Sequence, residues 1–268
     1  MSMVGVNVII MAQGEGSRWV ANPAYGHLPA PVLYKQLLPV GGETIISRSV
    51  RMYRERGFDD LLVVASRELL TLAGLQDGVI GCDLDEDPVL RSARLDQMHL
   101  GDRPRDLLRG ILATQSSWGP QGTVVALGDA LLSRRAMDRM WVQVAAGKPG
   151  VLARVKPNPV SGKDADEVFA MWFFPPAYDE VARRLREMVE QRGSLLRPSK
   201  PWGMPFAVLP ELDAVMAAYD RRGRERLAGI RQFLTLTDDY SDDVDCLTEY
   251  RTFWPSLMAA ALEDVDHE

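Results

Sequence analysis

Short runs of apolar, often β-branched residues recur along the chain, separated by polar segments. Residues 4–11 (VGVNVIIM), 60–66 (DLLVVAS) and 122–127 (GTVVAL) are almost wholly apolar. Such runs are typical of strands that are buried on both faces of a parallel sheet. Over the whole chain the pattern predicts strands at residues 4–11, 60–66, 78–82, 122–127, 151–155, 168–174 and 233–236.

Between these runs, apolar residues recur at the spacing of one face of a helix. In residues 44–56 this spacing is visible at Ile46, Val50 and Tyr53, and Gly57 suits the end of the helix. The same pattern predicts helices at residues 44–56, 68–73, 105–115, 135–145, 176–191, 212–219 and 247–262.

The alternation of strands with helices indicates βαβ units. We therefore predict an α/β fold, a single-domain, Rossmann-like three-layer sandwich whose sheet is mixed but mainly parallel. The first strand is expected to be central and to end at Gly14. We find no internal repeat and no linker that divides the 268 residues, a length that one large α/β domain can reach.

Composition narrows the range of partners. The chain is 46% hydrophobic and 25% charged, which is ordinary for a globular protein. Its net charge of -6 comes without a basic block, so we expect no nucleic-acid partner. Apolar runs stay below the roughly 18 residues of a membrane span, and residues 1–11 lack the basic start and cleavage site of a signal peptide. We expect a cytoplasmic protein without a membrane partner.

Cysteine and histidine give no sign of a zinc site. The two cysteines, Cys82 and Cys246, are far apart, and the three histidines, His27, His99 and His267, show no ligand spacing. We interpret both cysteines as ordinary thiols of a reducing compartment.

A glycine-containing turn follows the first strand, with the sequence MAQGEGSR at residues 11–18. Gly14 and Gly16 allow the backbone to approach a ligand closely, their N–H groups can bind an anion, and Arg18 can add a contact to phosphate. An ordinary turn explains G-x-G about as well. The P-loop pattern is absent, and Trp19 breaks the dinucleotide pattern G-x-G-x-x-G.

A second segment, KQLLPVGGETII at residues 35–46, opens the predicted helix 44–56. The two segments, in this order after an N-terminal strand, resemble the nucleotidyltransferase family of sugar-phosphate nucleotidyltransferases and related NTP transferases. The resemblance extends over residues 4–66 and 120–132, with a further likeness at 238–252. In this family an acceptor oxygen attacks the α-phosphorus and pyrophosphate leaves, so catalysis is mostly positioning and electrostatics.

The resemblance implies a nucleotide site along the glycine loop. Arg18 and Lys35 would be the catalytic residues, because the family uses the matching cations to neutralise phosphate charge. The residues implied in nucleotide binding are Ala12, Gln13, Gly14, Gly16, Ser17, Arg18, Lys35 and Gly128.

Two carboxylates are candidates for a Mg²⁺ site. Asp129 follows Gly128 at the end of a predicted strand, where open α/β sheets bind ligands, and the family holds Mg²⁺ with a G-D at this place. The ordinary alternative is a helix cap, for which Ser133 competes. The second ligand is expected in the acidic run 238–245, with Asp245 as first choice and Asp243 as second. A solvated acidic loop remains the alternative there.

The sequence gives weaker signals for the residues that bind the acceptor. Lys156 and Lys163 follow the predicted strand 151–155, and either could hold an acceptor phosphate, although solvent-facing loop charges explain them equally well. Residues 19–34 are long for this family, which leaves open whether they form a lid or a partner surface.

Together these features predict a Mg²⁺-dependent nucleotidyltransferase that joins a nucleoside triphosphate to a sugar phosphate or other small phosphorylated acceptor. Residues 1–132 would form the nucleotide-binding half, and residues 133–268 the acceptor half with the C-terminal helix. The alternatives are a glycosyltransferase of the same fold, disfavoured because Ala130 breaks a D-x-D motif, and an inactive nucleotide-binding regulatory module, kept open by Gln13. The nucleobase, the acceptor and assembly into a homo-oligomer stay open.

Overall fold

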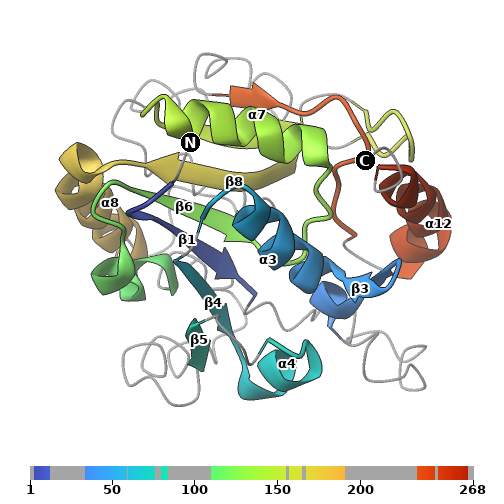
Figure 1. Ribbon diagram of the computed structural model, residues 1–268, viewed down its shortest axis with the longest axis horizontal. Coiled ribbons are helices and arrows are strands. Elements are labelled where there is room, and N and C mark those ends of the chain that lie inside the picture. The colour runs from blue at the N-terminus through green and yellow to red at the C-terminus, as the bar shows by residue number, and fades with distance from the viewer. Residues whose placement is uncertain are drawn as a thin grey trace.

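A seven-stranded sheet forms the centre of the computed structural model (Figure 1). The strands follow one another across the sheet in the order β5-β4-β1-β6-β8-β7-β9. Their bounds are β1 (Val6–Met11), β4 (Leu61–Ala65), β5 (Ile80–Asp83), β6 (Gly122–Leu127), β7 (Gly150–Arg154), β8 (Glu167–Phe173) and β9 (Leu234–Leu236). The structure describes residues 3–12, 34–58, 60–75, 80–83, 110–154, 157–164, 167–190, 234–244 and 247–264.

The sheet is mixed and mainly parallel, as predicted. β1 is an inner strand that pairs in parallel with β4 on one side and β6 on the other, and β5 continues the parallel series beyond β4. β8 is antiparallel to both of its neighbours, β6 and β7, while β9 is parallel to β7. The predicted end of the first strand, Gly14, lies outside the described residues, and β1 itself ends at Met11.

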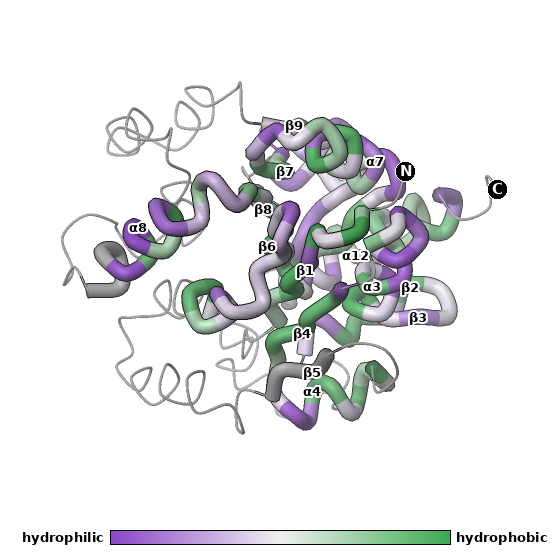
Figure 2. Tube along the Cα trace, turned by 60° about the vertical axis from the view of Figure 1, so that its left-hand side comes forward, coloured by the Kyte–Doolittle hydropathy of each residue, from purple (hydrophilic) through white to green (hydrophobic). Residues whose placement is uncertain are grey.

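Helices cover both faces of the sheet, which confirms the three-layer α/β architecture. α3 (Ile45–Glu55) and α7 (Arg134–Ala145) lie on one face, and α8 (Tyr178–Glu190) lies on the other (Figures 1 and 2). The side chains of β6 show the same division, because Val124 joins the core under α3 and α7 while Thr123 bonds the Tyr178 hydroxyl at 2.7 Å. The remaining elements are α4 (Arg67–Leu72), α12 (Leu247–Glu263), the short hairpin of β2 (Pro39–Val40) and β3 (Glu43–Thr44), and single 3-10 turns at Lys35–Leu37, Gln115–Ser117 and Pro175–Ala177.

The predicted helices agree with the structure wherever residues are described. Thr44, Ser66 and Ser133 cap α3, α4 and α7, because each side chain accepts a hydrogen bond from a backbone N–H in the first turn. Of the predicted helix 105–115, residues 110–115 are described, and the helix ends at residue 113, because Gln115 begins a 3-10 turn; the predicted helix 212–219 lies outside the described residues. None of the helices in the described ranges has the length and apolar character that crossing a membrane requires.

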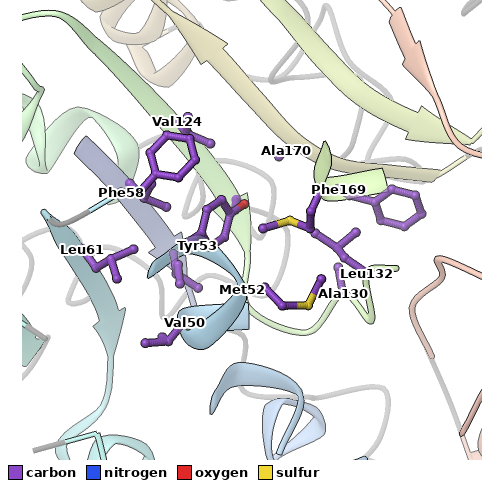
Figure 3. Packing of buried hydrophobic residues seen from close by; sticks show 14 of the residues in the cluster. Val50, Met52, Tyr53, Phe58, Leu61, Val124, Ala130, Leu132, Phe169 and Ala170 are labelled. Carbon is purple, nitrogen blue, oxygen red and sulfur yellow. The ribbon is translucent and has the colours of Figure 1, made fainter. Parts of the chain in front are cut away.

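The main hydrophobic core lies between the sheet and the helices α3 and α7 (Figure 3). Alternate residues of β1, Val8 and Ile10, point into it and are fully buried. Tyr53 and Phe58 meet there edge to face, with 5.6 Å between their ring centres. Since α3 and α7 share this core with β1, the core holds the first strand in a fixed position relative to both helices.

A second hydrophobic cluster packs α12 against three segments that are far apart in the chain. One segment follows Lys35, the next follows Asp129, and the last lies in the acidic run. Its buried members are Leu38, Val40, Ile45, Leu131, Tyr240, Val244, Trp254, Leu257 and Ala261. An antiparallel bridge reinforces the contact, because Leu131 and Asp242 exchange backbone hydrogen bonds of 2.8 and 3.0 Å.

We predict that the second cluster contributes strongly to stability. Leu257→Ala removes a side chain that is fully buried, so the free energy of unfolding should fall by about 2–5 kcal/mol. Leu262, on the same helix, is 40% exposed, and Leu262→Ala should change stability by no more than about 0.5 kcal/mol. Urea unfolding of both variants tests this prediction, and equal losses would contradict it.

Candidate active site

The carboxyl ends of β1 and β6 finish level with each other at the centre of the sheet. Met11 and Leu127 are partners in the register, and the backbone N–H of Gly128 donates to the Met11 carbonyl at 2.9 Å. Ala12 and Gly128 therefore lie side by side just beyond the strands. In open α/β sheets this edge is where ligands bind.

Gly128 is required here because of a close approach. A Cβ atom at this position would stand 2.8 Å from the Cβ of Ala12, which is closer than side chains tolerate. The glycine that precedes Asp129 thus allows two loops to leave the sheet edge in contact with each other. The steric reason is independent of any ligand.

Lys35 and Asp129 face each other at this edge. The Lys35 Nζ lies 3.6 Å from the Asp129 Oδ2, and the side chains are 11% and 19% exposed. The two residues are far apart in the chain, so the fold brings together two of the residues that sequence patterns singled out. Both side chains keep part of their surface in solvent, where a ligand can reach them.

The short turn Lys35–Leu37 positions the lysine. All three of its residues are buried, and Leu37 and Leu38 anchor the turn in the two hydrophobic clusters. Gln36 adds a polar contact, because its Nε2 donates to the carbonyl of Ala12 at 3.4 Å. This ties the turn to the residue at which β1 passes into the glycine loop.

Gln36 is a site residue that the sequence patterns did not single out. Its side chain is 2% exposed, and its Oε1 is buried without a hydrogen-bond partner among the described residues. The only signal in the sequence is a polar residue followed by apolar ones in KQLL. Such a position is equally common in solvated turns, so pattern alone could not identify it.

Asp129 does not serve as a helix cap. That role belongs to Ser133, whose Oγ accepts from the backbone N–H of Ala136 at 2.9 Å and donates to the Asp239 Oδ2 at 2.6 Å. The N-cap position of α7 is therefore occupied by Ser133, and the alternative role of Asp129 as a helix cap is wrong. Its carboxylate points to the sheet edge with Lys35 as neighbour.

The residues at this edge fit a Mg²⁺ ion. Mg²⁺ prefers carboxylate oxygens and usually takes one or two of them together with substrate phosphates. Asp129 offers such oxygens, partly exposed at the end of a central strand. Within the described ranges no group of three or more His, Cys, Asp or Glu side chains forms a complete cage for a metal, so substrate oxygens would have to complete the coordination.

Asp242, in the late acidic run, belongs to a buried ion pair. Arg154, at the end of β7, donates to both of its oxygens at 2.8 and 3.1 Å, and both side chains are fully buried. Asn158 donates a further hydrogen bond of 2.9 Å. Burial raises the pKa of the Asp242 carboxyl to about 6, and the opposing charges of Arg154 and Lys163 limit that rise. Through its contacts with Arg154 and Asn158, Asp242 holds the acidic run onto β7.

Lys163 lies in the same region, surrounded by carboxylates. Its Nζ is 2.7 Å from Asp243, 3.2 Å from Glu249 and 3.3 Å from Glu167. Burial disfavours the charged ammonium, but the charges of Asp243, Glu167 and Asp242 outweigh burial and raise the pKa of Lys163. An acceptor phosphate at Lys163 would meet these carboxylates as well. Binding of an acceptor phosphate by Lys163 stays a prediction. In the described residues, Lys163 forms ion pairs with carboxylates.

The cavity beside Lys163 has a volume of about 460 Å³. Carboxylates and hydroxyl groups dominate its polar lining, which suits neutral or cationic groups better than phosphate. The lining residues are Gly162, Lys163, Asp164, Thr248, Glu249, Thr252 and Phe253.

Several predicted site residues lie outside the described residues. They are Gln13, Gly14, Gly16, Ser17 and Arg18 of the glycine loop, the candidate acceptor contact Lys156 and the candidate metal ligand Asp245. For the described ones, the structure brings Ala12, Lys35, Gly128 and Asp129 to one edge, and it places Asp243 and Lys163 together in the acidic cluster.

Comparison with known proteins places the fold. No protein-family model and no curated protein sequence matches the chain. Among solved structures, the chain is similar to a protein named for glucose-1-phosphate thymidylyltransferase activity from Bacillus anthracis, with 17% identity, a TM-score of 0.51 and coverage of 98% of this chain and 96% of that one. It is also similar to a UDP-glucose pyrophosphorylase complexed with UDP-glucose, with 12% identity, a TM-score of 0.51 and coverage of 99% and 100%. In its described residues the chain therefore has the α/β fold of these two structures.

We predict that the close approach at the sheet edge makes Gly128 irreplaceable. Gly128→Ala should lower the free energy of unfolding by about 1–3 kcal/mol, because the added methyl group collides with Ala12. Gly42 has no atom within 4 Å of an added Cβ, so Gly42→Ala should change stability by only about 0.5 kcal/mol or less. Thermal and urea unfolding measure both effects, and a Gly128→Ala variant as stable as Gly42→Ala would refute the steric argument.

Proposed function

We propose that the chain is a Mg²⁺-dependent nucleotidyltransferase. It joins a nucleoside triphosphate to a sugar phosphate or another small phosphorylated acceptor and releases pyrophosphate. The observation that supports this most is the meeting of Lys35 and Asp129, 3.6 Å apart, at the carboxyl edge of β1 and β6. A cation that can bind phosphate and a carboxylate that can bind a metal thus lie side by side. The fold that carries them is similar to those of a protein named as a glucose-1-phosphate thymidylyltransferase and of a UDP-glucose pyrophosphorylase.

In this proposal the nucleotide binds along the glycine loop. Residues 1–132 form the nucleotide-binding half, in which Ala12 and Gly128 lie at the carboxyl edge of β1 and β6. Gln13, Gly14, Gly16 and Ser17 bind the nucleotide, and Arg18 with Lys35 neutralises the triphosphate. Their effect grows toward the transition state, because negative charge on the phosphoryl oxygens shifts to the departing pyrophosphate.

Asp129 and Asp245 hold the metal in this proposal. The bound Mg²⁺ would supply positive charge to the phosphate oxygens and help to align them. Support for Asp245 comes from its described neighbours. The antiparallel bridge between Leu131 and Asp242 sets the chain after Asp242 running toward the level of Asp129, and Val244 packs in the same cluster as Leu131.

Lys35 has two partners in the course of the reaction. Without ligand its ammonium pairs with Asp129. With the triphosphate bound, Lys35 would contact phosphate oxygens and Asp129 would hold the metal, so both charges would keep partners. Because each charged group would exchange one partner of opposite charge for another, the free-energy cost of removing it from water would stay low.

The acceptor half comprises residues 133–268, including α12. An oxygen of the acceptor phosphate attacks the α-phosphorus, the bond between that phosphorus and the bridging oxygen breaks, and the electron pair leaves with pyrophosphate. No covalent bond to the protein forms. Lys156 and Lys163 are the candidate contacts of the acceptor, and we propose a cytoplasmic location for the reaction.

The activity is tested by screening the four common NTPs against a panel of phosphorylated sugars and polyols in the presence of Mg²⁺. Pyrophosphate release that depends on both substrates supports the proposal. Release of a nucleoside diphosphate from a nucleotide sugar would indicate a glycosyltransferase instead. Nucleotide binding without turnover on any acceptor would indicate an inactive binding module.

We predict that removal of the charge on Asp129 abolishes most of the activity. Asp129→Asn keeps the shape of the side chain, so kcat should fall by about 10²-fold or more while the melting temperature stays within a few degrees. Lys35→Ala should raise KM for the NTP and lower kcat together. Glu180→Gln, which removes an exposed carboxylate paired with Arg183 and Arg184 on α8, serves as the control and should be fully active. Near-normal rates of Asp129→Asn with Mg²⁺ would contradict the metal assignment.

A further inference from the structure

The ammonium group of Lys35 lies within range of any metal ion that binds Asp129. Its Nζ is 3.6 Å from the Asp129 Oδ2, and Mg²⁺ binds carboxylate oxygens at about 2.1 Å. An ion on that oxygen would therefore lie within about 6 Å of the Lys35 Nζ, from whichever side it approached. Because the two side chains are only 11% and 19% exposed, water screens the repulsion between such cations poorly.

The backbone keeps Lys35 at this edge of the sheet. The Lys35 carbonyl accepts from the backbone N–H of Leu38 at 3.1 Å, and Leu38 is buried in the second hydrophobic cluster. Leu37 is buried in the main core, and Gln36 donates to the Ala12 carbonyl. The turn cannot carry the lysine away from the edge without breaking these contacts, so only rotations of the side chain can move the ammonium group.

The backbone around Asp129 is held in a similar way. On one side of it, the Gly128 N–H donates to the Met11 carbonyl at 2.9 Å. On the other side, Leu131 exchanges two backbone hydrogen bonds with Asp242 and is buried in the second cluster. Since both backbones are fixed, a metal ion on Asp129 meets the charge of Lys35 unless the lysine side chain turns to another anion.

A triphosphate can be that anion. In protein sites Mg²⁺ is usually shared between one or two carboxylates and the phosphates of a substrate. The phosphate oxygens can pair with the ammonium group of Lys35 and bind the metal at the same time. Binding of the nucleotide therefore removes the conflict between the two cations.

We propose that Lys35 suppresses metal binding at Asp129 until a nucleotide is bound. In the protein alone, the ammonium group neutralises the Asp129 carboxylate and repels divalent cations. When Lys35 pairs with the triphosphate, the carboxylate becomes available and the metal affinity rises. The inference rests on the proposed function, which assigns Asp129 to Mg²⁺, and it adds control of the metal site by a residue that binds no metal.

Lys35→Met is the decisive variant, because it removes the charge and keeps an unbranched side chain of similar length. Binding of Mn²⁺, which prefers the same oxygen ligands as Mg²⁺, is measured on the full chain by electron paramagnetic resonance without nucleotide. We expect Lys35→Met to bind Mn²⁺ about 10-fold or more tightly than wild type. Its turnover should nevertheless be slower. A lysine that only stabilised the fold would not suppress metal affinity.

Matched variants separate charge from shape and locate the ion. Lys35→Arg keeps the charge and should bind Mn²⁺ as weakly as wild type. Lys35→Gln should gain affinity as Lys35→Met does, and it replaces that variant if Met prevents folding. The gain should disappear when Asp129→Asn is combined with Lys35→Met. Glu180→Gln, the control, should match wild type.

The dependence on nucleotide is tested by repeating the titrations with each of the four common NTPs at saturation. The advantage of Lys35→Met over wild type should then vanish or reverse, because Lys35 pairs with phosphate. An advantage of the same size with every NTP would overturn the inference. So would equal Kd values without nucleotide, absence of Mn²⁺ binding in both proteins, or a gain that survives Asp129→Asn.

Pyrophosphate release tests the proposed function separately. If wild type releases pyrophosphate while Lys35→Met binds Mn²⁺ no more tightly than wild type, only the present inference fails. If the gain in Mn²⁺ affinity depends on Asp129 and vanishes with an NTP, but no acceptor gives turnover, the inference stands and the transferase activity is refuted.

Discussion

The parallel pairing of β1 with β6 determines where the candidate site forms. Because Met11 and Leu127 are partners, the two chains leave the sheet at the same level, and the contact of Gly128 with Ala12 keeps them together. The turn Lys35–Leu37 docks on this junction through Gln36, which brings its lysine to Asp129. A shift of the register by one residue would turn the side chains of β1 to the opposite faces and separate these groups. The hydrophobic core beneath, shared with α3 and α7, prevents that shift.

α12 contacts distant parts of the chain through its ends as well as through its apolar face. At its start, Glu249 reaches Lys163 on the loop before β8. At its end, Asp264 accepts hydrogen bonds from the Tyr240 hydroxyl at 2.6 Å and from the backbone N–H of Arg134 at 2.9 Å. Its Oδ2 also lies 3.5 Å from the buried Arg48 of α3. The described part of the acidic run is therefore held to the end of α12 by the Tyr240 hydrogen bond and to β7 by the ion pair of Asp242 with Arg154.

Local patterns in the sequence predicted the elements well and the contacts between them poorly. Residues 122–127 form β6 with the predicted bounds, and Ser133 caps α7, because burial on both faces and a cap each leave a local signal. The two-residue strands of β2 and β3 are too short to leave such a signal. The direction of β8 could not be inferred, since a fully buried run has the same composition in a parallel or an antiparallel strand. Arg154 and Asp242 are paired across 88 positions, and the pattern of a single sequence does not indicate that kind of partner. Lys163 shows the limit most clearly, because a loop lysine next to glycine has the same pattern whether water or carboxylates surround it.

The position of α12 in the chain also bears on how the protein is made. Its partners Leu38, Val40 and Ile45 belong to the first part of the chain, whereas α12 follows every other described element. During synthesis the ribosome therefore releases the parallel strands β1, β4, β5 and β6 long before the helix that covers the second hydrophobic cluster. Until that helix docks, the apolar side chains of the cluster are open to water and to other chains, which is the condition under which nascent proteins aggregate or recruit chaperones. Docking of α12 is thus a later step of folding than pairing of the parallel strands, and the delay between the two sets how long the exposed surface persists.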